Sequence, residues 1–217
     1  RRYLLSGGRA MVLLDPEIES GLEPLLQEFN VAVGNNIVVD PARRLPYASP
    51  LQLVIGVYGR HPVTRALQTF TMLFLARAVS VIDAGNTVNI GTDLLETSPR
   101  GWGETDTGGD TFRFDEDKDQ PGPVTVGVAI ANEKTGMRLV VIGDADFITN
   151  REISQGGNRD LFLNGVNWLL NREFLVLVGT KTIVEMKRLE LDKFQLSMIT
   201  LLVMGVVPAL SLLAGLF

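Results

Sequence analysis

Ala10-Met-Val-Leu-Leu14 is a continuous apolar run, bounded by Gly7-Gly8 before it and by Asp15-Pro16 after it. Such a run is typical of a strand that is buried on both faces, as the strands of parallel sheets are. Asp15 followed by Pro16 is typical of a helix start, and we expect a helix from there to Phe29. A further strand is expected within Asn30–Gly34. This strand–helix–strand order predicts an α/β fold with a layered, mostly parallel sheet.

The region after residue 120 shows the clearest pattern of strands and helices. Val124–Ala131 and Arg138–Ile142 are apolar runs typical of buried strands, and a turn is expected over Asn132–Gly136. A helix is expected from Asn158, as its cap, to about Asn171. Earlier in the chain, Phe70–Ile82 is apolar without a clean period, and we interpret it as a strand plus a turn.

The composition limits the chemistry that the protein can perform. The 217 residues include 20 Lys and Arg, 25 Asp and Glu, one His and no Cys, and 46% are hydrophobic. That apolar fraction is enough to bury a sizeable core, so we expect a folded protein. The net charge of −5 argues against nucleic-acid binding, which needs clustered Lys and Arg. Without Cys there is no disulfide, no thiolate metal site and no Cys nucleophile.

The last 24 residues, from Phe194 to Phe217, contain no ionisable side chain. As a helix they would reach about 36 Å, enough for a bilayer core of about 30 Å. We therefore expect this C-terminal apolar segment to be a transmembrane helix, and a buried core helix is the alternative. The chain then divides into an extracytoplasmic α/β domain over 1–179, incomplete at its N-terminus, a juxtamembrane stalk over 180–193 and the helix over 194–217. The balanced charges of the stalk favour a location outside the cytoplasm for the domain.

The sharpest candidate site is Val140-Val-Ile-Gly-Asp-Ala-Asp146. Asp144 and Asp146 follow a buried strand, at the end where open α/β sheets bind ligands. One interpretation is a Mg²⁺-dependent phosphohydrolase of the haloacid-dehalogenase-like type, with an aspartate as nucleophile. That motif needs Thr or Val two positions after the second Asp, where this chain has Ile148. The alternative, which we favour, is that both carboxylates cap the following turn and bind loop amides.

Three weaker candidates remain. Arg60 and His61 are candidates for binding an anionic ligand, although a single His in a turn is more often structural.

Asp115-Glu-Asp-Lys-Asp119 lies in a polar, glycine-rich stretch over 101–120 and has the spacing of the start of a Ca²⁺ loop. It lacks the Gly and Glu that such a loop needs later, which favours a solvated acidic loop. Gly156–Asp160 opens a helix and is explained by capping. We predict neither a metal nor another cofactor.

Several segments follow one another in a recognisable order. They are Tyr3–Pro16, Gly59–Thr64, Leu94–Trp102 with Glu104–Asp106, Val141–Phe147 and Asn158–Trp168, and the C-terminal apolar segment follows them. In this order they resemble the extracytoplasmic domain of GldG-like auxiliary proteins of ABC transporters, a group named from gliding motility. The resemblance implies a flavodoxin-like or class I glutamine amidotransferase-like sheet. It also implies a relationship to a domain of an intraflagellar transport protein.

The function that this resemblance implies is a non-enzymatic accessory subunit, for substrate binding or scaffolding, beside the permease and ATPase of an ABC transporter. Its location would be the inner membrane of a bacterium, with the domain in the periplasm and residues 194–217 in lipid. No catalytic residue carries over, and amidotransferase chemistry would need the Cys that this chain lacks. Two alternatives stay open: a phosphohydrolase that uses Asp144 and Asp146, and a glycan- or solute-binding module at the carboxyl edge of the sheet with Arg60 and His61.

Overall fold

The computed structural model describes residues 1–45, 49–82, 88–108 and 112–172, and also residues 174, 197–198, 200–206, 208 and 211. The chain forms two compact units, Arg1–Thr180 and Lys181–Phe217. All strands of the described residues belong to the first unit, which is called the body below. The candidate site residues lie in the body as well.

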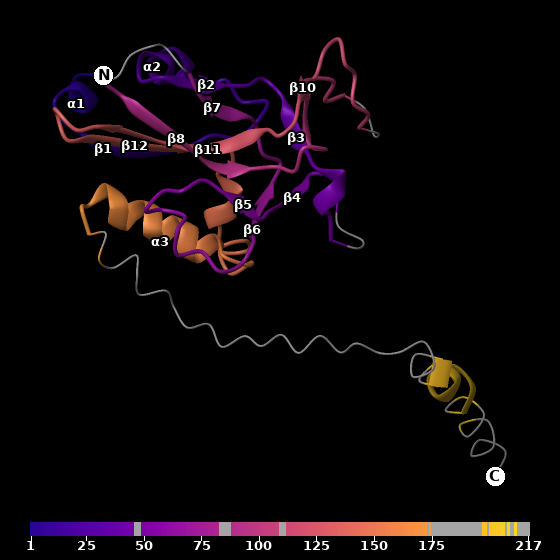
Figure 1. Cartoon of the computed structure of the whole chain (residues 1–217). Helices are drawn as coiled ribbons and strands as arrows, with labels where there is room; N and C mark the ends of the chain where they lie inside the picture. Colours follow the sequence, from indigo (N-terminus) through magenta and orange to yellow (C-terminus); the bar gives the residue numbers. More distant parts are fainter. Residues whose placement is uncertain are drawn as a thin grey trace. The chain divides into compact units, whose positions relative to one another are not determined.

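A five-stranded sheet with the order β1-β12-β11-β8-β5 forms the centre of the body (Figure 1). Its strands are β1 (Arg9–Leu13), β12 (Met137–Ile142), β11 (Thr125–Asn132), β8 (Ile90–Glu96) and β5 (Val57–Tyr58). β1 and β12 run parallel, with Met11 opposite Val140. The pairs β11–β12, β11–β8 and β5–β8 are antiparallel. The central sheet is therefore mixed and mostly antiparallel.

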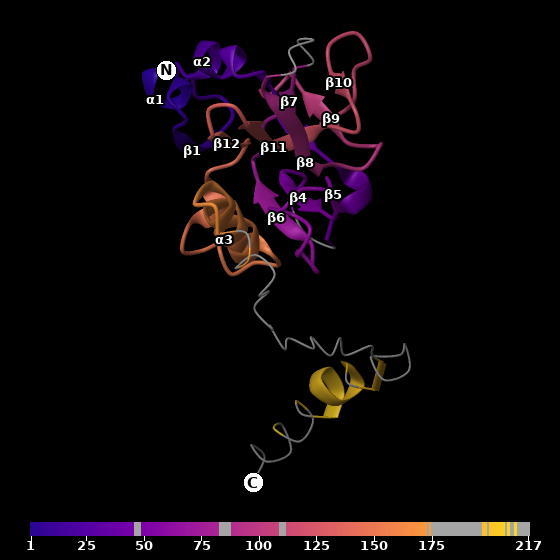
Figure 2. The ribbon, with the colours of Figure 1, turned by 60° about the vertical axis from the view of Figure 1, so that its left-hand side comes forward.

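Smaller antiparallel sheets and short helices complete the body. The sheets pair β10 (Gln120–Pro121) with β9 (Trp102–Glu104) and β3 (Ile37–Val39), β2 (Val31–Val33) with β7 (Val79–Val81), and β4 (Gln52–Ile55) with β6 (Thr71–Phe74). The helices are α1 (Arg2–Leu5), α2 (Glu23–Glu28) and α3 (Asn158–Leu169), with the single turns η1 (Pro41–Arg43) and η2 (Asp146–Ile148). β10 and α1 lie at opposite ends of the body (Figure 2).

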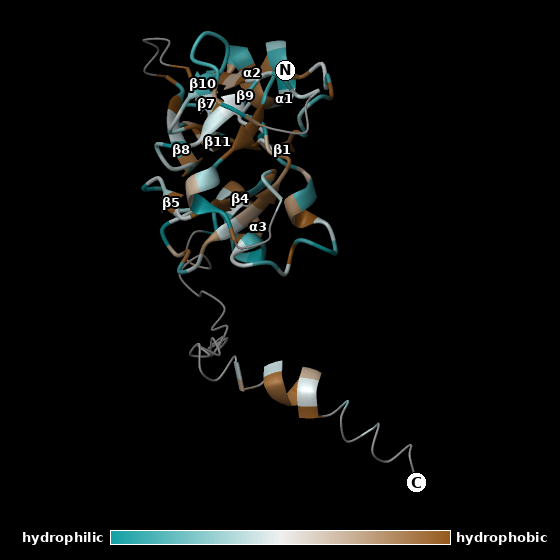
Figure 3. Ribbon diagram, turned by 90° about the vertical axis from the view of Figure 1, so that its right-hand side faces the viewer, coloured by the Kyte–Doolittle hydropathy of each residue, from teal (hydrophilic) through white to brown (hydrophobic). Residues whose placement is uncertain are grey.

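Both faces of the central sheet are covered, which explains the continuous apolar runs in its strands. In β12, Val140 and Ile142 belong to one core, together with Trp168 of α3. Leu139 and Val141 belong to the other core, with side chains of α2, β2 and β7. Figure 1 shows α3 on one side of the sheet and α2 with β2 and β7 on the other. Hydrophobic residues accordingly gather in the strands and hydrophilic ones in the outer loops (Figure 3).

The predicted layered, mostly parallel sheet of the flavodoxin-like or class I glutamine amidotransferase-like kind is wrong, because most pairings in the central sheet are antiparallel. The strands β1, β11 and β12 themselves lie where the sequence predicted strands. Apolar runs typical of burial on both faces favour parallel strands, but antiparallel strands covered on both faces have the same pattern. The turn between Asn132 and Met137 is too short for a parallel crossover, which takes about a dozen residues, so β11 and β12 pair as a hairpin.

One predicted helix also differs from the structure, and another falls mostly outside the described residues. The helix expected from Asp15 to Phe29 is reduced to α2, because Glu17 and Gly21 have φ values of 61° and 71°, which a right-handed helix excludes. Most of residues 194–217, over which the sequence predicted a transmembrane helix, lie outside the described residues. In the part of the chain that the structure describes, no helix is both long and apolar enough to cross a bilayer. The described element of that segment is η3 (Leu202–Val206), five residues of π-helix.

Candidate functional site

The parallel strands β1 and β12 end next to each other, and a carboxylate follows each of them. Asp15 comes two residues after β1, and Asp144 comes two residues after β12. The backbone approaches closely at Gly143, where a Cβ would lie 2.0 Å from the carbonyl oxygen of Arg77. Only glycine fits there, and its carbonyl oxygen accepts a hydrogen bond from the backbone N–H of Arg77 at 2.7 Å. This is the carboxyl edge at which the sequence analysis placed its sharpest candidate site.

Asp144 is fully buried, with 0% of its surface exposed. Its Oδ2 accepts a hydrogen bond from the backbone N–H of Phe74 in β6 at 2.8 Å. Its Oδ1 accepts from the backbone N–H groups of Asp146 at 2.6 Å and Phe147 at 3.2 Å. The carboxylate thus joins the loop after β12 to β6 and accepts from the first two backbone N–H groups of η2. Because both of its oxygens already accept from the backbone, little acceptor capacity remains for a metal ion.

Burial raises the pKa of Asp144 from 3.8 to about 7, because an ionised carboxylate is poorly solvated inside the body. The three amide hydrogen bonds act in the opposite direction, since they stabilise the ionised form, and charge repulsion from Asp15 adds to the increase. A strongly perturbed acid at a strand end is a common sign of a functional site. At Asp144 the burial and the three backbone partners account for the perturbed pKa, and they fit the capping interpretation of this residue.

Asp15 and Asp146 do not extend Asp144 into a cluster that could perform chemistry. Oδ1 of Asp15 accepts a hydrogen bond from the backbone N–H of Ala145 at 2.7 Å, which ties the end of β1 to the loop after β12. Asp146 is exposed and begins η2. Among the described residues, no group of three or more His, Cys, Asp and Glu side chains could hold a metal ion.

Arg77 is a buried residue of this edge that sequence reasoning missed, and only 4% of its surface is exposed. Its guanidinium donates to the backbone carbonyl oxygens of Gly34 at 2.8 Å, Asp15 at 3.1 Å and Ile18 at 3.2 Å. Burial lowers the pKa of Arg77, and the nearby carboxylates of Glu23 and Asp15 oppose that effect. The sequence did contain a signal, because Arg77 is the single charged residue in the apolar stretch Phe70–Ile82.

Asn158 differs from its predicted role as a helix cap. It is the first residue of α3, and Gly157 occupies the N-cap position. The Asn158 side chain is fully buried and bridges to β6 instead, where it accepts from the backbone N–H of Met72 at 2.8 Å and donates to the carbonyl oxygen of Met72 at 2.7 Å. It also donates to the carbonyl oxygen of Glu152 at 3.0 Å. The helix start Gly156–Asp160 thus has a structural explanation.

Arg60 and His61 lie on the turn that follows β5, on different elements from Asp144 and Asp146. The His61 ring packs edge-on against Trp168 of α3, with 4.7 Å between the ring centroids. Arg60 is exposed. Eight residues between Tyr58 and Leu67, Arg60 and His61 among them, line an open hollow of about 540 Å³. The structure therefore brings Arg60 and His61 together at one place and the strand-end aspartates together at another.

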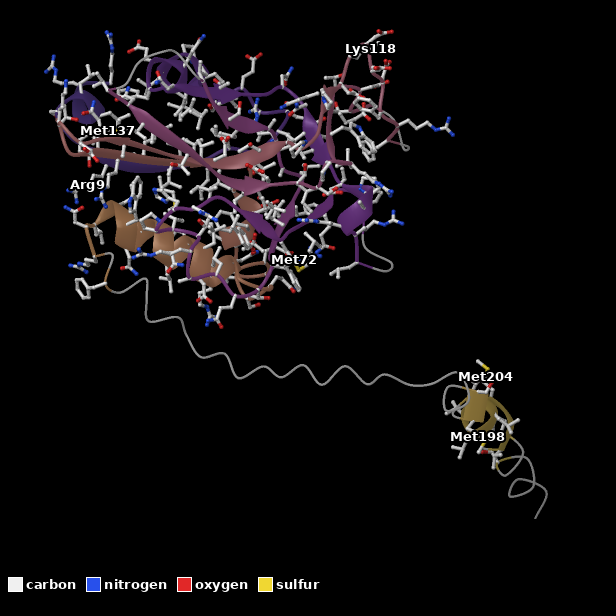
Figure 4. All side chains as sticks on the ribbon, viewed as in Figure 1. Arg9, Met72, Lys118, Met137, Met198 and Met204 are labelled. Carbon is white, nitrogen blue, oxygen red and sulfur yellow. The ribbon has the colours of Figure 1, made fainter. Side chains whose placement is uncertain are left out.

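The predicted acidic loop over 101–120 contains the short strand β9 and the start of β10. Its buried Asp119 accepts hydrogen bonds from backbone amides of the same segment. Asp119 accepts from the backbone N–H groups of Thr105 at 2.9 Å and Asp115 at 2.8 Å. Burial alone would raise the pKa of Asp119, but these hydrogen bonds outweigh it and lower the pKa. Lys118, labelled in Figure 4, lies 3.3 Å from the Asp115 carboxylate. These contacts fit an acidic loop whose carboxylates bind backbone amides and a lysine.

Comparisons with known proteins give distant structural likenesses and no match in sequence. No protein-family model matches this chain, and no curated protein matches it in sequence. Among solved structures, the chain is similar to the mmIFT52 N-terminal domain, with 20% sequence identity and a TM-score of 0.54. The likeness covers 77% of this chain and 67% of that chain. At this identity it shows the fold alone, and it does not bear on the resemblance to GldG-like proteins.

Proposed function

We propose that this chain is a non-enzymatic accessory subunit of an ABC transport system, with a substrate-binding or scaffolding role, as the resemblance to GldG-like proteins implies. In this proposal it binds the permease and ATPase subunits at the inner membrane of a bacterium. Residues 194–217 contact membrane lipid, and the body lies outside the cytoplasm. A role in gliding motility belongs to the same proposal.

The non-enzymatic part of the proposal is supported by the burial and the hydrogen bonds of Asp144 at the carboxyl edge of the central sheet. A phosphohydrolase needs an aspartate that reaches both Mg²⁺ and the phosphoryl group. Asp144 is fully buried, and its two oxygens accept three hydrogen bonds from backbone amides. A metal ion or a substrate could reach it only after those amides had lost their partner, which costs about 1–3 kcal/mol for each buried group. This favours a structural carboxylate over a nucleophile.

The membrane part of the proposal is supported by the composition of the C-terminal apolar segment. It carries no ionisable side chain between Phe194 and Phe217. Its described apolar side chains are largely exposed, and Met204, labelled in Figure 4, is 78% exposed. An uncharged apolar stretch of this length favours an apolar environment such as lipid. Contact of this segment with the bilayer would supply that environment.

Co-purification from detergent-solubilised membranes tests the proposal. The full chain, carrying an affinity tag at its N-terminus, should recover a multi-span permease and an ATPase in reproducible amounts. A matched bait that carries the same tag but has Lys at Met198, Leu202 and Val206 separates membrane contact from binding by the body. Recovery of neither subunit with the unmodified chain, across several detergents, would contradict the assignment to an ABC transport system.

A further inference from the structure

The hollow between Tyr58 and Leu67 lies in the most basic part of an acidic chain. From Pro41 to Ile82 the sequence contains five Arg and the single His but no Asp or Glu, whereas the whole chain has a net charge of −5. Two of these arginines, Arg60 and Arg65, line the hollow and are exposed. The hollow therefore gathers positive charge where no carboxylate of its own segment can neutralise it.

The guanidinium groups of Arg60 and Arg65 make no side-chain hydrogen bond to the residues that the structure describes, whereas several other arginines of the body do. Arg77 donates to backbone carbonyls, and Arg9 donates to the carbonyl oxygen of Leu169 at the end of α3 (Figure 4). No ion pair joins Arg60 or Arg65 to a residue that the structure describes. Guanidinium groups bind carboxylate and phosphate oxygens with two parallel hydrogen bonds, and they do so best when no other acceptor competes.

The turn that carries these arginines is fixed by its own hydrogen bonds. The Thr64 hydroxyl donates to the carbonyl oxygen of Gly59 at 2.6 Å. The backbone N–H of Arg65 donates to the carbonyl oxygen of His61 at 2.9 Å. Gly59 is required, because a Cβ there would lie 1.8 Å from the carbonyl oxygen of Asp93 in β8. The backbone positions of the two arginines are thus set before any ligand arrives, which lowers the entropy lost on binding.

Contacts with α3 fix the turn at His61 and Val63. The His61 ring packs against Trp168, and the Asn164 side chain donates to the carbonyl oxygen of Val63 at 3.1 Å. Nδ1 of His61 accepts a hydrogen bond from the backbone N–H of Val63 at 3.2 Å, so a neutral His61 ring carries its proton on Nε2. The imidazole is therefore held in one orientation at the wall of the hollow.

From these observations we infer that the hollow binds a small anion through carboxylate or phosphate oxygens, with Arg60 and Arg65 as the binding residues and His61 in its wall. The inference goes beyond the proposed accessory role and does not depend on it, because binding and subunit recovery have separate readouts. Chains that bind the anion but recover no permease would overturn only the transport assignment.

His61 provides a direct probe, because it is the single histidine of the chain. The full chain, labelled with ¹³C- and ¹⁵N-histidine in non-ionic detergent, is titrated at constant ionic strength with inorganic phosphate in one arm and succinate in the other. Sodium chloride provides the reference. The inference expects saturable shifts of the His61 signals with at least one of the two anions, and the comparison of the arms shows whether phosphate or carboxylate oxygens are preferred.

Three variants locate the binding. Arg60→Gln with Arg65→Gln should weaken binding about tenfold or more, since each change removes a charge-assisted contact. The charge-conserving Arg60→Lys with Arg65→Lys should weaken it less. Arg100→Gln, which removes an exposed arginine outside the hollow, should leave it unchanged. Shifts no larger than those with chloride overturn the inference, and so does an equal loss of binding in Arg100→Gln, which would show a general charge effect.

Discussion

Asp144→Asn replaces a buried carboxylate that joins the loop after β12 to β6, and it leaves the size of the side chain unchanged. Burial raises the pKa of Asp144 from 3.8 to about 7. Between these two pH values the folded state therefore binds more protons than the unfolded state. The stability that depends on Asp144 is fully present below about pH 4 and is lost as the pH rises through 7. At about 1.4 kcal/mol per pH unit, the loss reaches about 4 kcal/mol in the free energy of unfolding.

The Asp144→Asn variant has no carboxyl proton to lose at this position, so the loss is absent from it. Its amide oxygen can still accept from the backbone N–H groups of Asp146 and Phe147, but its amide nitrogen would face the N–H of Phe74. The lost acceptor costs about 1–3 kcal/mol at every pH. We therefore expect the variant to be less stable than the wild type at pH 4.5 and more stable at pH 8, with the two curves crossing in between.

Urea unfolding of the full chain in non-ionic detergent, followed by the fluorescence of its two Trp, measures both curves. Burial also raises the pKa of Asp93, and hydrogen bonds lower that of Glu23, but both residues are present in each protein and cancel in the difference. The matched control is Asp146→Asn, an exposed carboxyl two residues away. A wild type that gains stability over the variant between pH 4.5 and 8 would refute the reasoning, because the amide hydrogen bonds would then outweigh burial.

Three further outcomes follow from the structure. Gly143→Ala should destabilise the body by more than about 3 kcal/mol in urea unfolding, because the added Cβ would lie 2.0 Å from a backbone carbonyl oxygen. In the control Gly108→Ala the added Cβ has its nearest atom at 3.7 Å, so the free energy of unfolding should change little. Asn158→Ala leaves the buried N–H and carbonyl groups of Met72 without their partner, and a loss of about 3–5 kcal/mol is expected; a loss below about 1 kcal/mol would mean that water replaces the side chain. Met204→Lys places a charge in the C-terminal apolar segment at a cost of about 3 kcal/mol in lipid, so alkaline extraction should release more of it than of Met204→Leu, and equal release would contradict lipid contact.

The sequence was sufficient to place individual strands but not to pair them. The apolar runs at Ala10–Leu14, Val124–Ala131 and Arg138–Ile142 are all strands, because burial on two faces leaves the same pattern in any sheet. Pairing depends on the connections, and the short turn before Met137 contained that information. β8 was not predicted, since its burial is irregular and its register with β11 shifts around Gly127, which removes the alternation that marks a strand.

At the candidate site the sequence predicted which residues are unusual, but not the partners that decide their roles. Asp144 was named from its place after a buried strand, and the capping interpretation agrees with its three amide partners. One of those partners, Phe74, is 70 residues away in the sequence, so no local pattern predicts the contact. Asn158 shows the same limit, because its partner Met72 is 86 residues away and turns an expected cap into a bridge between elements.

Several acids are buried in the described part of this body, where irregular loops rather than long helices follow most strands. In a doubly wound sheet, helix starts and regular crossovers organise the backbone at the strand ends, whereas here irregular loops leave amide groups that need acceptors. Carboxylates supply them: Asp144 and Asp15 do so beside β12, and Asp40 does so at the backbone N–H of Ser98, at 2.7 Å. The carboxylates of these acids already accept hydrogen bonds from the backbone, so they are poor candidates for binding a ligand. The acid-free stretch Pro41–Ile82 places its arginines where no such acceptor lies nearby in the sequence, and that is why the hollow at Arg60, rather than the carboxyl edge of the sheet, is the place to look for a ligand.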